Sequence, residues 1–246
     1  MSPVVIAHRG ASHDYAEHTY EAYVAAVQAG ADGFECDVRL TADNMLICWH
    51  DSDLNRTSDR SGSISRLTWA EISRANAGSW HFAHRDAKPL LFAELLELAV
   101  NAGKTISIET KHPVPTGGRV EYALAEVLKP YLPLLPNAPA LAQFRMMSFS
   151  RLAVRRWKEL VPSVPAVALV EREPTKFETP VVGPGIELIR KDPSLVDRLH
   201  KQGREVHVWT VDDPKDVALC LELNVDAIIT NKPAEVRREI FGALGD

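Results

Sequence analysis

Short runs rich in β-branched residues alternate along the chain with amphipathic segments, and this alternation constrains the fold more than any other feature of the sequence. It is typical of repeated βα units and not of a helix bundle or a β-sandwich. About eight units fit into 246 residues, which predicts one domain (residues 1–246) folded as a closed (β/α)8 TIM barrel. An open doubly wound sheet uses the same local units and is the alternative. The expected strands are Val4–Ala7, Gly33–Val38, Thr105–Glu109, Arg145–Ser148, Val164–Leu169, Ile186–Ile189, Glu205–Trp209 and Ala227–Thr230.

Capping residues mark several helices between these strands. Thr19 can cap the helix that follows the first strand, and Gly30 can end it. Asp192 and Asp213, each followed by proline, open two later helices. Prolines in residues 171–185 leave room for a poor helix or none, so the fifth unit is expected to be irregular.

The segment after the second strand breaks the simple alternation. Turn-forming residues 41–44 lead into Met45–His50, which we interpret as the returning arm of a hairpin. The polar stretch from about 51 to 88 then predicts a small insertion. Within it, Thr68 and Glu71 have the spacing of a capping box that opens one short helix.

Charge and hydropathy limit the partners that the chain can have. The net charge is −5, and no long run of one sign suggests nucleic-acid binding or a membrane-surface patch. No apolar run approaches the roughly 20 residues that span a bilayer, and no signal peptide is recognisable. We therefore expect a cytoplasmic protein without stable membrane insertion; the sequence leaves its oligomeric state open. The odd set of Cys36, Cys48 and Cys220 predicts buried free thiols.

Polar residues gather where the first three expected strands end, which is where a TIM barrel places its reactive groups. Residues two apart on a strand face the same side, so Glu35 projects with Asp37 and Glu109 projects with Lys111, while Cys36 faces away. Three carboxylates at one point would repel one another unless a cation held them. Because oxygen ligands favour a hard ion, the prediction is one divalent metal ion, Mg²⁺ or Ca²⁺. Ion pairs of these carboxylates with Arg39 or Lys111 are the alternative.

His8 and His50 are the candidate proton carriers, since imidazole titrates near neutral pH. His8 is followed by Arg9 and Gly10, and His50 is followed by Asp51. Arg9 and Lys111 supply positive charge for a phosphate, and the glycine would allow close backbone approach. Together with a metal, these groups predict phosphoryl-transfer chemistry. The other histidines are expected to be structural: His13, His18, His81, His84, His112, His200 and His207.

Several stretches, in order over nearly the whole chain, resemble the glycerophosphodiester phosphodiesterase family: IAHRGAS, AEHTYEAYVAAVQAGADGFECDVRLTADNMLICWHDSDLNRTS, KPLLFAELLELA, ISIETK, MMSFS, VWTVDD and VDAIITNKP. The resemblance implies a barrel with a small insertion after the second strand. It also implies metal-dependent hydrolysis of glycerophosphodiesters to glycerol 3-phosphate and an alcohol. Attack by the substrate's own glycerol hydroxyl would give a cyclic phosphate that water then opens.

The same resemblance implies roles for single residues: catalytic His8 and His50; metal-binding Glu35, Asp37 and Glu109; phosphate-contacting Arg9 and Lys111; and Trp209 as a wall of the glycerol pocket. Two positions depart from the family. His18 replaces the usual asparagine, which we expect to alter the surroundings of Glu17, and Asn231 replaces a common aspartate. The residues do not indicate which histidine is the base.

Three alternatives remain open at this point. A lysophospholipase D-type phosphodiesterase would use the same histidines and metal on membrane lipids. A barrel that only binds a phosphate ligand would lack a metal ligand or a histidine, and none is missing. The chemistry of a metal-dependent aldolase or isomerase would give His8 and His50 no shared role. The alcohol part of the diester is not indicated by the sequence.

Overall fold

Eight parallel strands close into a barrel in the computed structural model, which describes residues 2–132, 143–172 and 178–244. The strands are β1 (Val4–His8), β2 (Gly33–Leu40), β5 (Thr105–Thr110), β6 (Phe144–Ser148), β7 (Ala166–Val170), β8 (Val181–Pro184), β9 (Glu205–Val208) and β10 (Ala227–Thr230). Because β1 pairs with both β2 and β10, no strand of this set is left at an edge. The TIM barrel is confirmed, and the open sheet is excluded.

One expected strand is wrong. Ile186–Ile189 lies in α6 (Ile186–Lys191), and the strand of that unit is β8, a few residues earlier. Short buried helices and buried strands have the same apolar composition, so periodicity cannot separate them. Pro184 is tolerated because it stands at the end of β8. Part of the preceding stretch, residues 173–177, lies outside the described residues.

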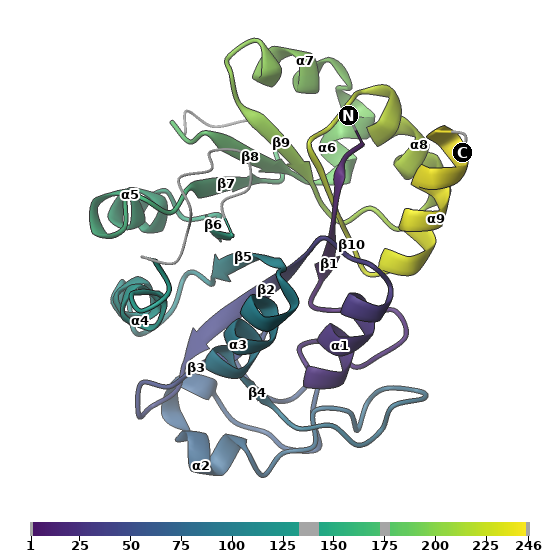
Figure 1. Cartoon of the computed structure of the whole chain (residues 1–246). Coiled ribbons are helices and arrows are strands. Elements are labelled where there is room, and N and C mark those ends of the chain that lie inside the picture. Colours follow the sequence, from purple (N-terminus) through teal and green to yellow (C-terminus); the bar gives the residue numbers. More distant parts are fainter. Residues whose placement is uncertain (1, 133–142, 173–177, 245–246) are drawn as a thin grey trace.

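The helices form a ring around the outside of the barrel (Figure 1). They are α1 (Tyr20–Gln28), α3 (Phe92–Ala102), α4 (Arg119–Leu128), α5 (Arg151–Leu160), α6, α7 (Ser194–His200), α8 (Pro214–Glu222) and α9 (Pro233–Leu244). Two expected caps are confirmed, since the side chains of Thr19 and Asp213 accept backbone hydrogen bonds at the start of α1 and α8. Asp192 and Pro193 come directly before α7, as expected.

The insertion after β2 is confirmed as well. β3 (Leu46–Cys48) returns antiparallel to β2, and β4 (Leu90–Leu91) pairs antiparallel with β3. Between them lie the 3₁₀ turn η1 (Ile64–Arg66) and the short helix α2 (Trp69–Ile72), which begins with the expected capping box. The insertion packs a small apolar core of its own: Ile47, Trp49, Leu54, Ile64, Ile72 and Ala77.

Apolar side chains fill the barrel below the mouth and separate it from the helices. The interior cluster contains Ile6, Met147, Val167, Leu169, Val181, Ala227 and Ile229, so an apolar layer lies beneath the polar groups at the strand ends. A larger cluster lies between strands and helices and includes Cys36, which faces away from its carboxylate neighbours as predicted. All three cysteines are buried and free. Among the described helices, none combines the length and apolar character needed to cross a bilayer.

Candidate active site

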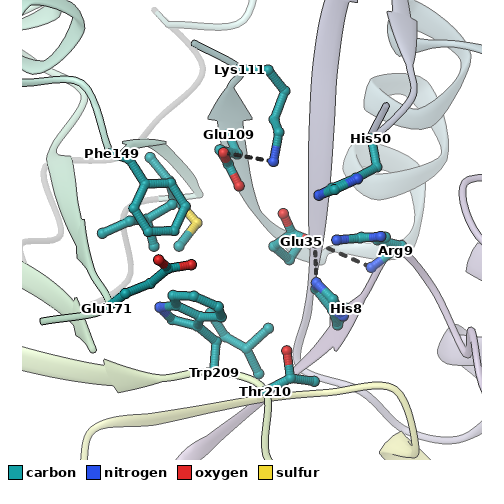
Figure 2. Close-up of a pocket in the computed structure, with 13 residues that line it drawn as sticks. His8, Arg9, Glu35, His50, Glu109, Lys111, Phe149, Glu171, Trp209 and Thr210 are labelled. Carbon is teal, nitrogen blue, oxygen red and sulfur yellow. Dashed lines mark hydrogen bonds and ion pairs between the residues drawn. The ribbon is translucent and has the colours of Figure 1, made fainter. Parts of the chain in front are cut away.

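A cavity of about 210 Å³ opens at the mouth of the barrel, at the carboxyl ends of the strands (Figure 2). One side, here called the polar half, consists of His8, Arg9, Glu35, His50, Glu109 and Lys111. The other side, the apolar half, consists of Met147, Phe149, Leu169, Trp209 and Ile229. Asp37 lies fully buried next to the polar half. The structure therefore brings together all eight residues that the sequence predicted for the site.

The three predicted metal ligands form one buried cluster. Glu35 and Asp37 come from β2, and Glu109 stands beside Asp37 on the neighbouring strand β5. One carboxylate oxygen of each lies within 4.8 Å of the others, and each residue is at most 8% exposed. As predicted, Glu35 and Asp37 project to the same side of β2, and Glu109 of β5 meets them there.

Burial and mutual repulsion make this cluster costly in its ionised form. Burial, together with the charge of Asp37, raises the pKa of Glu35 well above its usual range and the pKa of Glu109 to about 8. Burial would also raise the pKa of Asp37, but a hydrogen bond from His18 and nearby cations outweigh it and lower that pKa. Glu35 and Glu109 therefore favour the protonated state, and a divalent cation would fit in the place of these protons. Hard oxygen donors in this arrangement suit Mg²⁺ or Ca²⁺.

Two cations reach into the cluster. Lys111 Nζ lies 3.1 Å from Asp37 Oδ1 and 2.9 Å from Glu109 Oε1, which confirms that Lys111 and Glu109 project together. Arg9 Nε lies 3.1 Å from Asp37 Oδ2. Of the ion pairs considered as the alternative to a metal, the one with Lys111 is present, while Arg39 donates two hydrogen bonds to the carbonyl oxygen of His50.

His8 is held in one tautomer by a hydrogen-bonded relay. Asn231 Nδ2 donates to Asp212 Oδ2 over 2.5 Å, which turns the amide oxygen of Asn231 toward His8. That oxygen lies 2.7 Å from His8 Nδ1, so Nδ1 carries the hydrogen and Nε2 carries the lone pair. Nε2 lies 3.8 Å from Glu35 Oε2. Burial and the charge of Arg9 lower the pKa of His8 to about 4, so the ring is neutral near pH 7.

His50 has a different partner. It follows β3 on the insertion, and its Nδ1 lies 2.6 Å from Asp51 Oδ1. Burial lowers the pKa of His50, and the carboxylate of Asp51 opposes that effect. A carboxylate partner stabilises an imidazolium by hydrogen bond and by charge, whereas the neutral amide of Asn231 offers His8 the hydrogen bond alone. The pKa of both rings is thus lowered, and the two histidines differ in the partner of Nδ1: an amide oxygen for His8 and a carboxylate for His50.

The apolar half is built around two aromatic rings that meet edge to face, with 5.5 Å between the centroids of Phe149 and Trp209. The indole of Trp209 donates to the carbonyl oxygen of Gly183 over 2.7 Å, which fixes its orientation. The carboxylate of Glu171 faces the same side of the cavity (Figure 2). Sequence reasoning missed Phe149 and Glu171, although both directly follow a strand and that position was the available signal.

The two departures from the family both contact site residues. His18 Nε2 lies 2.8 Å from Asp37 Oδ2, and its Nδ1 lies 2.9 Å from the hydroxyl of Tyr23, so His18 contacts a predicted metal ligand. It also interacts electrostatically with Glu17, as expected. Asn231 is the partner of His8. Gly10 has a packing role: a Cβ there, at a φ of +85°, would lie 2.7 Å from the Ala22 backbone of α1. None of the other six histidines lines the cavity.

A closed parallel barrel with a buried carboxylate cluster, two cations and two differently partnered histidines at its mouth defines a barrel enzyme equipped for phosphate ester chemistry. The comparisons with known proteins identify the family. Residues 8–235 match the model of the glycerophosphoryl diester phosphodiesterase family. The chain is 37% identical to a probable glycerophosphodiester phosphodiesterase 1 of Mycobacterium tuberculosis, over 96% of this chain and 91% of that protein. It is 31% identical to a glycerophosphodiester phosphodiesterase of Bacillus subtilis, over 94% of this chain and 84% of that protein.

The structural comparison agrees. An Oleispira antarctica phosphodiesterase, solved in complex with the product sn-glycerol-3-phosphate, superimposes with a TM-score of 0.87 at 25% identity, over 97% of each chain. The chain belongs to the glycerophosphoryl diester phosphodiesterase family and is an enzyme of that class. This assignment decides against the aldolase or isomerase alternative.

Proposed function

We propose that the protein hydrolyses glycerophosphodiesters to glycerol 3-phosphate and an alcohol, with one divalent metal ion, Mg²⁺ or Ca²⁺, held by Glu35, Asp37 and Glu109. The observation that supports it most is the meeting of this carboxylate cluster with two cations and two histidines in one cavity. The bound metal would act as a Lewis acid on a phosphate oxygen.

Arg9 and Lys111 would hold the phosphate. Both line the cavity, and both already stand beside carboxylates whose charge offsets theirs. As substrate binds, their donors can turn to the phosphate oxygens, where charge increases in the transition state. Arg9 suits a bidentate contact, whereas Lys111 supplies a compact charge.

We assign the base to His8 and the acid to His50. His8 is neutral, and its Nε2 lone pair is directed to the interior of the site, so it can take the proton from the glycerol hydroxyl that attacks phosphorus. His50 is paired with Asp51, which stabilises the protonated ring that would then give a proton to the leaving alkoxide. Water would open the cyclic phosphate by the reverse use of the same two groups. An attached hydroxyl needs no second substrate to be positioned.

The apolar half would receive the glycerol carbons. Trp209 and Phe149 form its walls, and the Glu171 carboxylate lies where it could accept a hydrogen bond from a glycerol hydroxyl. The Oleispira antarctica relative was solved with the product sn-glycerol-3-phosphate, which supports glycerol 3-phosphate as the product of this chain.

A panel of glycerophosphodiesters with choline, ethanolamine or glycerol as the alcohol tests the proposal. Each is incubated with the enzyme and Mg²⁺, Ca²⁺ or Mn²⁺, and released glycerol 3-phosphate is measured. We expect turnover of at least one diester with a hard cation. No glycerol 3-phosphate from any diester with any of the three metals would contradict the proposal.

A lysophosphatidylcholine arm separates the lysophospholipase D-type alternative. Two exposed apolar side chains lie between the end of β6 and the first turn of α5: Phe149 (39% exposed), which lines the cavity, and Leu152 (60% exposed). They would give an acyl chain some contact, but they make a smaller apolar rim than a membrane substrate favours. We expect glycerophosphocholine to be hydrolysed faster than lysophosphatidylcholine, and the opposite order would favour the alternative.

A further inference from the structure

A continuous chain of charged side chains connects the phosphate-binding cation with the proposed acid. Arg9 Nη1 lies 3.0 Å from Glu17 Oε1. Arg56 then spans the space from Glu17 to Asp51, and Asp51 in turn holds His50. Arg9 and Glu17 belong to the segment between β1 and α1, whereas Asp51 and Arg56 belong to the insertion. Two separate parts of the fold therefore meet through one guanidinium group.

The planar guanidinium group of Arg56 binds the carboxylate of Asp51 on one side and that of Glu17 on the other. Its Nε donates to Asp51 Oδ2 over 2.7 Å, and one Nη2 contact to Asp51 Oδ1 measures 3.2 Å. Toward Glu17, Nη1 donates to Oε2 over 3.0 Å and Nη2 donates to Oε1 over 2.8 Å. A lysine ammonium cannot reproduce these paired, coplanar contacts.

This arrangement stabilises both carboxylates in their ionised form. Burial would raise the pKa of Glu17, but hydrogen bonds from Arg56 and the charge of Arg9 lower it to about 2. For Asp51 burial acts in the same direction, and the contacts from Arg56 and His50 lower its pKa to about 2. Without Arg56, two ionised groups would lose the cation that they share, and their side chains would be free to leave Arg9 and His50.

We propose that Arg56 is a positioning residue that couples the orientation of His50 to that of Arg9. The inference rests on the proposed function and adds a residue of the insertion that does not line the cavity. Arg56 is exposed over 45% of its side chain, and exposed ion pairs contribute little to folding. Its loss should therefore affect turnover much more than stability.

Steady-state kinetics of Arg56→Gln and Arg56→Lys test this inference, with the glycerophosphodiester that the wild type hydrolyses fastest and saturating metal. Small displacements of catalytic groups cost up to about a hundredfold, so we expect Arg56→Gln to lower kcat by about tenfold to a hundredfold. KM should change less than about threefold, because Arg9 keeps its contact with Asp37 and so stays beside the phosphate. Arg56→Lys should recover part of kcat. The control is Arg60→Gln, an exposed arginine of the same insertion whose Nε donates to the Arg74 carbonyl; it should behave as wild type.

Two results of the kinetics would overturn the proposal. One is wild-type kcat in Arg56→Gln. The other is additive losses when Arg56→Gln is combined with Asp51→Asn, because residues that act through each other give a double variant no slower than the slower single one. Thermal melting checks the fold, and we expect Tm to change by less than about 4 °C in Arg56→Gln.

NMR signals of the histidine rings, recorded without substrate, separate this inference from the proposed function. In Arg56→Gln we expect the ring nitrogen signals of His50 to shift while those of His200, which pairs with Asp226 on the far side of the barrel, stay in place. If the wild type hydrolyses no glycerophosphodiester, the proposed function fails. If the His50 signals do not respond, the positioning role fails, whatever the substrate.

Discussion

The two halves of the cavity differ in origin and in internal connection. The polar half comes from β1, β2, β5 and the insertion, that is, from residues 8–111, and ion pairs and hydrogen bonds of 2.6–3.1 Å join its polar groups to one another and to Glu17, Asp37 and Asp51. The apolar half comes from β6, β7, β9 and β10, and its side chains mainly pack on one another. The ion pairs and hydrogen bonds of the polar half hold single atoms at defined distances, whereas the packing of the apolar half sets the shape of its side of the cavity. Changes in the polar half should therefore affect kcat, and changes in the apolar half should affect KM.

Metal removal should give the largest effect, because it acts on the centre of the polar half. We expect dialysis against EDTA to abolish hydrolysis and Mg²⁺ or Ca²⁺ to restore it. Calorimetric titration of metal into the apo enzyme should show one site that Glu109→Gln weakens. Full activity in thoroughly metal-free enzyme would contradict the metal assignment.

Loss of either histidine should come next. His8→Ala and His50→Ala should each lower kcat by roughly a hundredfold or more, the usual scale for acid and base groups, with circular dichroism unchanged. His200→Ala serves as the matched control and should keep kcat near wild type. Near-normal turnover in one of the two variants would remove that histidine from the mechanism.

A substitution in the apolar half tests the other side of the comparison. Trp209→Ala removes a wall of the cavity, so we expect KM to rise about tenfold while kcat changes much less. Trp80→Ala, which removes an exposed tryptophan of the insertion, should leave both constants unchanged. If Trp209→Ala lowers kcat as strongly as the histidine variants do, the division between the two halves is wrong.

The smallest expected effect concerns the relay behind His8. Asn231→Asp places a carboxyl group 2.7 Å from Nδ1 that shares one proton with Asp212, and the negative charge of this pair favours the imidazolium and raises the pKa of His8. Because a base acts in its neutral form, the acidic limb of the kcat/KM profile should move to higher pH by about one unit. A shift of the alkaline limb instead would indicate that His8 is the acid and His50 is the base.

Much of the polar half could be predicted because it depends on local rules. Side chains two apart on a strand share a face whatever the rest of the chain does, which placed Glu35 with Asp37 and Glu109 with Lys111. The barrel followed from the repeated βα pattern, and the hairpin brought His50 to the same mouth. Prediction failed where a buried helix and a buried strand share one local pattern: the run Ile186–Ile189 lies in the helix α6, and the strand of that unit is β8.

The sequence alone thus determined the barrel, the insertion and the residue types at the strand ends. The tertiary structure decided which of them touch. Asn231 reaches His8 across 223 positions because β10 closes onto β1, and Arg56 reaches Glu17 across 39 because the insertion folds back over the mouth. Phe149 and Glu171 joined the site in the same way, from strands on the opposite wall. Strand parity is set by backbone geometry within a few residues, whereas contacts across the barrel exist only once closure has brought distant strands together.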